Sequence, residues 1–179
     1  MQLTHYALSM PDLPISYYLI LENSLFFTLA TLFLILAGWA WRKTKPYTLP
    51  EPLPGWFKIW FGTVQVTGGI LPLIALIWGV WRGYPTVLLV LIPYLVILGL
   101  QIISEILTLR QFQSVVWVFV PYVYLPYRFW QLYEGLTILS PNEDLIWIRY
   151  LLILNLIIWI GNYLLDVTQL PKLLCWPME

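Results

Sequence analysis

Polar side chains recur at helical spacing inside the most apolar parts of this chain. Gln101 and Glu105 are four residues apart, Asn162 and Asp166 are also four apart, and Asn155 lies seven residues before Asn162. Residues four or seven apart share one face of an α-helix, so we expect two polar stripes, which we call the inner group. Burial favours the neutral form of a carboxyl group, so Glu105 or Asp166 could exchange a proton or orient a substrate. These two residues are the catalytic candidates.

The inner group also has a purely structural interpretation. Its carboxylates would then lie within a turn or two of the membrane surface, pair with Arg110 or Lys172, and hold helices together. The spacing alone fits both interpretations.

A second set of charged and amide side chains is expected towards the opposite surface. A charge at membrane depth costs about 2.5–3.5 kcal/mol on insertion scales, so each one needs a partner or a role. Arg128 would form an interhelical pair with Glu22 or Glu134, or would contact an anion or a lipid headgroup. We call this set the outer group, and it comprises Glu22, Arg128, Gln131, Glu134 and Arg149.

The composition excludes several chemistries. The single histidine, His5, lies outside the apolar stretches, so we expect no metal site, haem or histidine-ligated chlorophyll in the bundle. A carotenoid or a lipid stays open as a ligand, and the cofactor is unknown. Cys175 is the single cysteine and cannot build a thiolate cluster. Nine basic and nine acidic residues balance, which argues against nucleic-acid binding.

Five apolar stretches must position these groups. Hydrophobic residues make up 60% of the chain and charged residues 10%, against about 25% charged residues in soluble domains. Each stretch is long enough to cross a hydrocarbon core of about 30 Å as a helix. We therefore predict an all-α fold, a polytopic transmembrane helix bundle that forms a single domain over residues 1–179. Its spans are expected at about 18–41, 59–81, 86–109, 114–139 and 145–168.

Basic residues predict the orientation of the bundle. Cytoplasmic connections carry an excess of Lys and Arg, and the segment before the first span has none. Four basic residues crowd the connection after it, which predicts an N-out/C-in topology: Arg42, Lys43, Lys45 and Lys58.

The fourth predicted span contains two prolines, Pro121 and Pro126. A proline pushes the preceding residue away from helical geometry. We expect this span to be broken, with a helix to about Val120, an irregular turn and a second helix from Pro126. The alternative is one continuous, kinked helix.

Two adjoining segments resemble small integral-membrane proteins of cyanobacteria and their plant relatives, a group with no assigned activity. The likeness covers about 35 residues and rests on aromatic residues and prolines placed around a Glu and an Arg. It implies a bacterial plasma membrane or a thylakoid membrane, with a photosynthetic or bioenergetic neighbour. The segments are QIISEILTLRQF, residues 101–112, and QSVVWVFVPYVYLPYRFWQLYEGL, residues 113–136.

The sequence favours a non-enzymatic protein. Aromatic residues make up 17% of the chain, more than interfacial belts need, and their rings offer surface to a partner helix, a lipid or a polyene. We expect a subunit, assembly factor or scaffold of a larger membrane complex, which binds a lipid or an apolar pigment. Its partners would be membrane lipids and other membrane-protein subunits or further copies of itself. The alternative is a small membrane-embedded enzyme or a proton-coupled transporter that uses Glu105 and Asp166.

Overall fold

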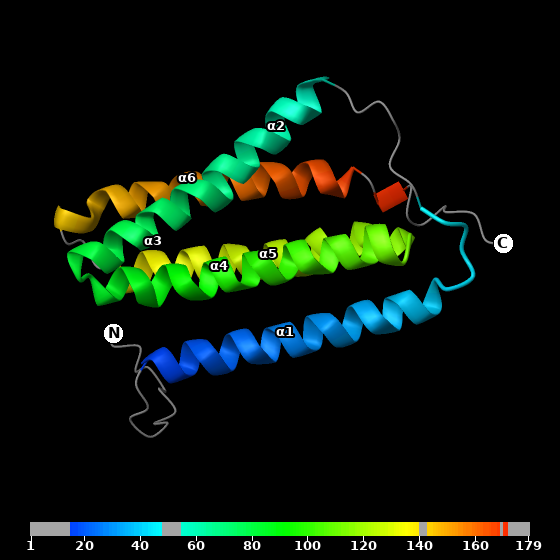
Figure 1. Ribbon diagram of the computed structural model, residues 1–179, viewed down its shortest axis with the longest axis horizontal. Helices are drawn as coiled ribbons and strands as arrows, with labels where there is room; N and C mark the ends of the chain where they lie inside the picture. Colours follow the sequence, from blue (N-terminus) through cyan, green and yellow to red (C-terminus); the bar gives the residue numbers. More distant parts are fainter. Residues whose placement is uncertain (1–14, 48–54, 140–142, 169, 172–179) are drawn as a thin grey trace, which may run out of the picture.

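The computed structural model describes residues 15–47, 55–139, 143–168 and 170–171, and His5, Lys172 and Cys175 lie outside these ranges. The described chain is helical and contains no extended strand. Figure 1 shows its helices side by side. They are α1 (Ile15–Ala40), α2 (Gly55–Gln65), the π-helix η1 (Val66–Ile70), α3 (Leu71–Arg82), α4 (Pro85–Ile106), the π-helix η2 (Leu107–Gln111), the 3-10 helix η3 (Val115–Val118), α5 (Phe119–Ile138), the 3-10 helix η4 (Glu143–Leu145) and α6 (Ile146–Val167).

Four of the described helical segments are long and apolar enough to cross a membrane: Ile15–Ala40, Gly55–Arg82, Pro85–Gln111 and Ile146–Val167. This confirms the all-helical prediction and fits a multi-pass membrane protein. The second segment joins α2, η1 and α3, so it begins four residues before the predicted span at 59. The predicted fourth span is not among these segments, and the N-out/C-in orientation stays a prediction.

The predicted break in the fourth span is wrong, because α5 is one continuous helix from Phe119 to Ile138. Pro121 falls in its first turn, where backbone N–H groups have no helical acceptor. Pro126 lies inside the helix and removes one backbone hydrogen bond without ending it. The irregular backbone comes earlier, where Ser114 precedes η3 and its side-chain oxygen accepts a hydrogen bond from the Val116 N–H.

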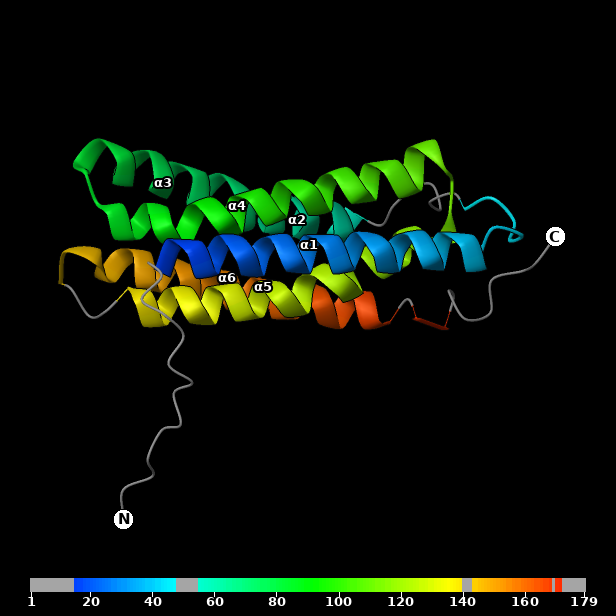
Figure 2. The ribbon, with the colours of Figure 1, turned by 90° about the horizontal axis from the view of Figure 1, so that it is seen from below.

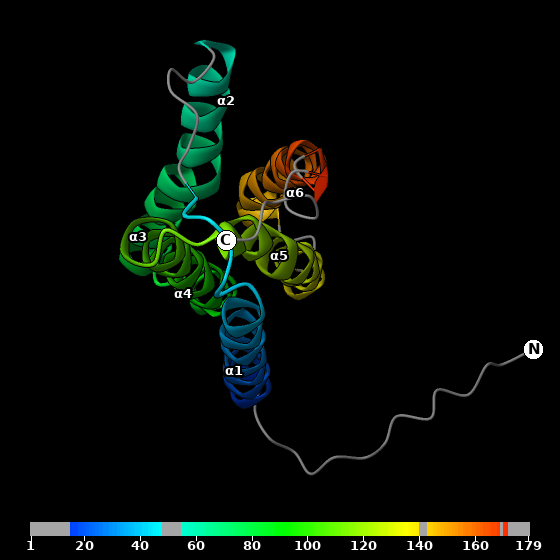
Figure 3. The same cartoon turned by 90° about the vertical axis from the view of Figure 1, so that its right-hand side faces the viewer.

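Helix α5 is the most buried by protein among the long helices. It packs against α1, α4 and α6, and Figure 3 shows it among these three neighbours. Its buried residues include Arg128 and Gln131 as well as Val120 and Leu125. The low apolarity of α5 therefore follows from its position, since its polar side chains face other helices instead of lipid.

Helices α3 and α4 form a tight antiparallel hairpin, joined by Gly83 and Tyr84. Helix α3 ends at Arg82 and α4 begins at Pro85. Between them, Gly83 adopts a left-handed conformation with φ of 69°, which glycine reaches without steric cost. This turn sets α3 and α4 side by side.

Helices α1 and α2 form the margins of the bundle. Figure 2 shows α1 running along α4 and α5, and α1 buries only Leu19, Ala30 and Ala37. Helix α2 diverges from the other helices in Figures 1 and 3, and Val64 is its single buried residue. The hydrophobic core therefore lies between α3, α4, α5 and α6.

Candidate binding centre at Arg128

The largest fully buried side chain among the described residues is Arg128, in the middle of α5, with 0% of its surface exposed. Its Nε, Nη1 and Nη2 atoms have no hydrogen-bond partner among the described residues. The guanidinium carbon lies 4.2 Å from the ring centroid of Trp159 on α6 and 5.6 Å from that of Tyr94 on α4. A desolvated cation–π contact contributes about 2 kcal/mol, whereas burial of an ion costs several kcal/mol. The two rings therefore offset only part of the cost.

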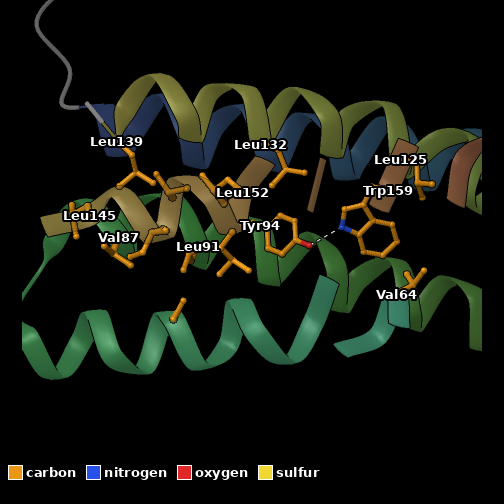
Figure 4. Close-up of a cluster of buried hydrophobic side chains, with 14 residues drawn as sticks. Val64, Val87, Leu91, Tyr94, Leu125, Leu132, Leu139, Leu145, Leu152 and Trp159 are labelled. Atoms are coloured by element: carbon orange, nitrogen blue, oxygen red, sulfur yellow. Dashed lines mark hydrogen bonds between the residues drawn. The ribbon is translucent and has the colours of Figure 1, made fainter. Parts of the chain in front are cut away.

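A hydrogen-bonded triad of Tyr94, Trp159 and Asn155 fixes the two rings, and Figure 4 shows its Tyr94–Trp159 hydrogen bond. The Tyr94 hydroxyl donates to the Gly68 carbonyl at 2.7 Å and accepts from Trp159 Nε1 at 2.8 Å. The Oδ1 atom of Asn155 lies 3.2 Å from the same hydroxyl. Pro72, four residues after Gly68, has no N–H to donate to the Gly68 carbonyl. The Tyr94 hydroxyl on α4 is thus anchored to the backbone of η1.

The ring of Trp159 packs so closely against Gly68 that a larger residue would not fit there. A Cβ atom on Gly68 would lie 2.5 Å from Trp159 Cζ2, closer than real Cβ contacts come. Gly68 lies in the π-helix η1, an irregular turn of a kind often found at functional sites. The position of the Trp159 ring beside Arg128 therefore depends on its close contact with the backbone of η1 at Gly68.

The carboxylates of the inner group are each held by an amide from the same helix. Gln101 Nε2 donates to Glu105 Oε1 at 2.7 Å, and Asn162 Nδ2 donates to Asp166 Oδ2 at 3.0 Å. Trp60 Nε1 on α2 donates to Asn162 Oδ1 at 3.3 Å. The spacing of four residues thus produces a carboxylate–amide pair on α4 and another on α6.

Electrostatic interactions connect these pairs with Arg128. Glu105 interacts electrostatically with Arg128 and also with Asp166, so α4, α5 and α6 each contribute one ionisable group to the same region. The fifth inner residue, Asn155, belongs to the Tyr94 triad. Arg110, an expected partner of the carboxylates, is exposed at the end of η2.

The outer group does not assemble as one cluster. Arg128 lies with Tyr94 and Trp159 and has no ion pair with Glu22 or Glu134 among the described contacts. Six residues separate Arg128 from Glu134, which places them about 120° apart around α5. Arg149 instead donates to the carbonyls at the C-terminal end of α5, those of Leu136 at 2.8 Å and Leu139.

Sequence reasoning missed the aromatic half of this centre. Trp159 follows Asn155 by four residues, and Pro72 follows Gly68 by four, so both spacings were present in the sequence. Neither spacing shows which helices become neighbours. Comparisons of the chain with family models, with curated proteins and with solved structures give no match.

Proposed function

We propose that this protein is a non-enzymatic integral-membrane subunit, assembly factor or scaffold of a larger membrane complex, which binds an amphipathic ligand through an acidic group at Arg128. The observation that carries the proposal is the fully buried guanidinium whose three nitrogen atoms have no hydrogen-bond acceptor among the described residues. A planar guanidinium matches the two oxygens of a carboxylate or a phosphate. A lipid or a pigment that carries such a group would supply the missing acceptor.

The rings around Arg128 hold the guanidinium in place. Trp159 and Tyr94 are fixed by their mutual hydrogen bond, so the guanidinium that lies against them is preorganised for an acidic group. The inner carboxylates are also fixed, each by an amide one turn away. This rigidity favours binding and orientation over a cycle of proton transfers.

Helix α2 supports the role as a subunit of a larger assembly. It diverges from the bundle (Figure 3) and leaves Trp56, Ile59 and Phe61 exposed. In a bilayer these side chains would contact lipids, another membrane-protein subunit or a second copy of the chain. The membrane would be a bacterial plasma membrane or a thylakoid membrane, as the resemblance of residues 101–136 implies.

The test is purification in a mild detergent, followed by absorption spectra and mass analysis of all bound molecules. The wild-type protein is expected to retain an acidic lipid or pigment, and Arg128→Gln is expected to lose it. Arg82→Gln is the matched control, because Arg82 is exposed at the end of α3. Wild-type protein that is free of lipid, pigment and protein partners contradicts the proposal.

A second candidate function is a small membrane-embedded enzyme or a proton-coupled transporter. It is favoured by one observation, the electrostatic interaction of Glu105 with both Arg128 and Asp166. Under this alternative, Glu105→Gln abolishes pH-driven flux in proteoliposomes while the protein stays folded. Under the binding proposal, Glu105→Gln leaves the retained ligand in place.

A further inference from the structure

A small hollow lies between α1, α4 and α5, away from the Arg128 centre. Its volume is about 10 Å³, which is room for roughly one water molecule or one small ion. It lies at the end of the bundle where α1 and α4 begin and α5 ends. The hollow is lined by Leu19, Asn23, Leu89, Val90, Pro93, Gln131, Glu134, Gly135 and Ile138.

The amide side chains at this hollow have fixed orientations. Asn23 Nδ2 donates to the Leu19 carbonyl at 2.6 Å, which turns Asn23 Oδ1 towards α5. Gln131 Nε2 donates to that Oδ1 atom at 2.7 Å. Gln131 is 9% exposed, and its Oε1 atom has no hydrogen-bond partner among the described residues. The lining of the hollow therefore includes a buried acceptor that receives no hydrogen bond from these residues.

The α4 side of the hollow contains a proline. Pro93 has no N–H, so the carbonyl of Leu89, four residues earlier, cannot accept the usual helical hydrogen bond from it. Both residues line the hollow. Carbonyls released in this way near membrane depth are groups that coordinate alkali cations in membrane proteins.

The charge at the hollow is negative. Glu134 is part of the lining, and Glu22 on α1 interacts with it electrostatically. The lining contains no basic residue. Arg149 is engaged with carbonyls at the end of α5. The lining thus combines an unpaired amide oxygen with a carboxylate.

We propose that this hollow binds a single monovalent cation of the size of Na⁺. Its ligands would be Gln131 Oε1, Asn23 Oδ1, the Leu89 carbonyl and the Glu134 carboxylate. Ca²⁺ takes six to eight oxygen ligands and Mg²⁺ a rigid octahedron, which this small set does not provide. The cation would tie the first turns of α1 to α4 and α5, where α1 buries few residues of its own. The site is independent of the ligand proposed at Arg128.

The test is the thermal unfolding midpoint of the detergent-solubilised full chain, with NaCl or KCl replacing choline chloride at constant ionic strength. A cation that binds the folded state raises the midpoint as its concentration rises. Na⁺ is expected to raise the wild-type midpoint above its value in choline, and K⁺ to do so less. Glu134→Gln and Gln131→Met should each weaken the apparent Na⁺ affinity by about tenfold or more.

Asp144→Asn is the matched control, because it removes one carboxylate at an exposed position outside the hollow. Its Na⁺ response should equal that of the wild type. If Gln131→Met does not fold, the half-buried Glu134 still provides the decisive variant. Equal midpoints in NaCl and choline chloride overturn the proposal and leave a water or a proton as the occupant. An unchanged Na⁺ response in Glu134→Gln overturns it as well.

Discussion

Tyr94→Phe removes one oxygen atom and its interhelical hydrogen bonds, of which the two shortest are those with Gly68 and Trp159. The hydroxyl donates to Gly68 at 2.7 Å and accepts from Trp159 Nε1 at 2.8 Å, so the substitution leaves a buried N–H and a buried carbonyl unpaired. Interhelical hydrogen bonds in membrane proteins contribute about 0.6 kcal/mol on average and about 1.7 kcal/mol at most. Two such bonds predict that the free energy of unfolding falls by about 1–3 kcal/mol.

The assay is reversible unfolding in mixed micelles with increasing dodecyl sulfate, followed by circular dichroism. Tyr133→Phe is the matched control, because Tyr133 also lies in a long helix but is 58% exposed. The control is expected to keep the wild-type unfolding free energy. If Tyr94→Phe is as stable as the wild type, or if both variants lose the same amount, the triad does not anchor α4 to η1 and α6.

Three further predictions concern packing, a helix end and the buried charge. Gly68→Ala should lower the free energy of unfolding by about 1–3 kcal/mol through overpacking against Trp159. Gly69→Ala should leave it unchanged, since its Cβ would make an ordinary 3.9 Å contact. Thermal unfolding of the two variants measures the difference. Arg149→Leu should speed amide hydrogen exchange in the last turn of α5, whose carbonyls Arg149 binds, and unchanged exchange there would contradict this. Arg128→Met should be less stable than the wild type when both are purified with their ligand. After ligand extraction it should be equally or more stable than the extracted wild type, because an unpaired buried charge costs more than an apolar side chain. Denaturation before and after extraction measures the sign of this stability difference.

The apolar helices and the tight hairpin were predictable because each depends on local sequence. Hydrophobic length predicted the helix from Ile146 to Val167 nearly to the residue. The four residues from Arg82 to Pro85 left no alternative to an antiparallel turn. The carboxylate–amide pairs on α4 and α6 were likewise visible as spacings of four.

The course of α5 and the surroundings of Arg128 depend on neighbours that spacing does not show. Pro126 was expected to begin a second helix after an irregular turn, but α5 continues through it as one helix that packs against α1, α4 and α6. The segment was predicted as a membrane span, but α5 is not among the described helices that are long and apolar enough to cross a membrane. Arg128 was expected to pair with Glu22 or Glu134, or to contact an anion or a lipid headgroup, whereas the register between α4, α5 and α6 places it against Tyr94 and Trp159.

In the proposed binding mode, the Arg128 guanidinium receives its missing acceptor from a bound acidic ligand. Native mass spectrometry of the full chain, released from lipid nanodiscs, measures whether such a ligand is bound. The wild-type protein is expected to carry one acidic amphipathic molecule that survives activation, and Arg128→Gln is expected to appear at its bare mass. A wild-type protein at its bare mass, or an Arg128→Gln variant with the same bound molecule at the same occupancy, would contradict it.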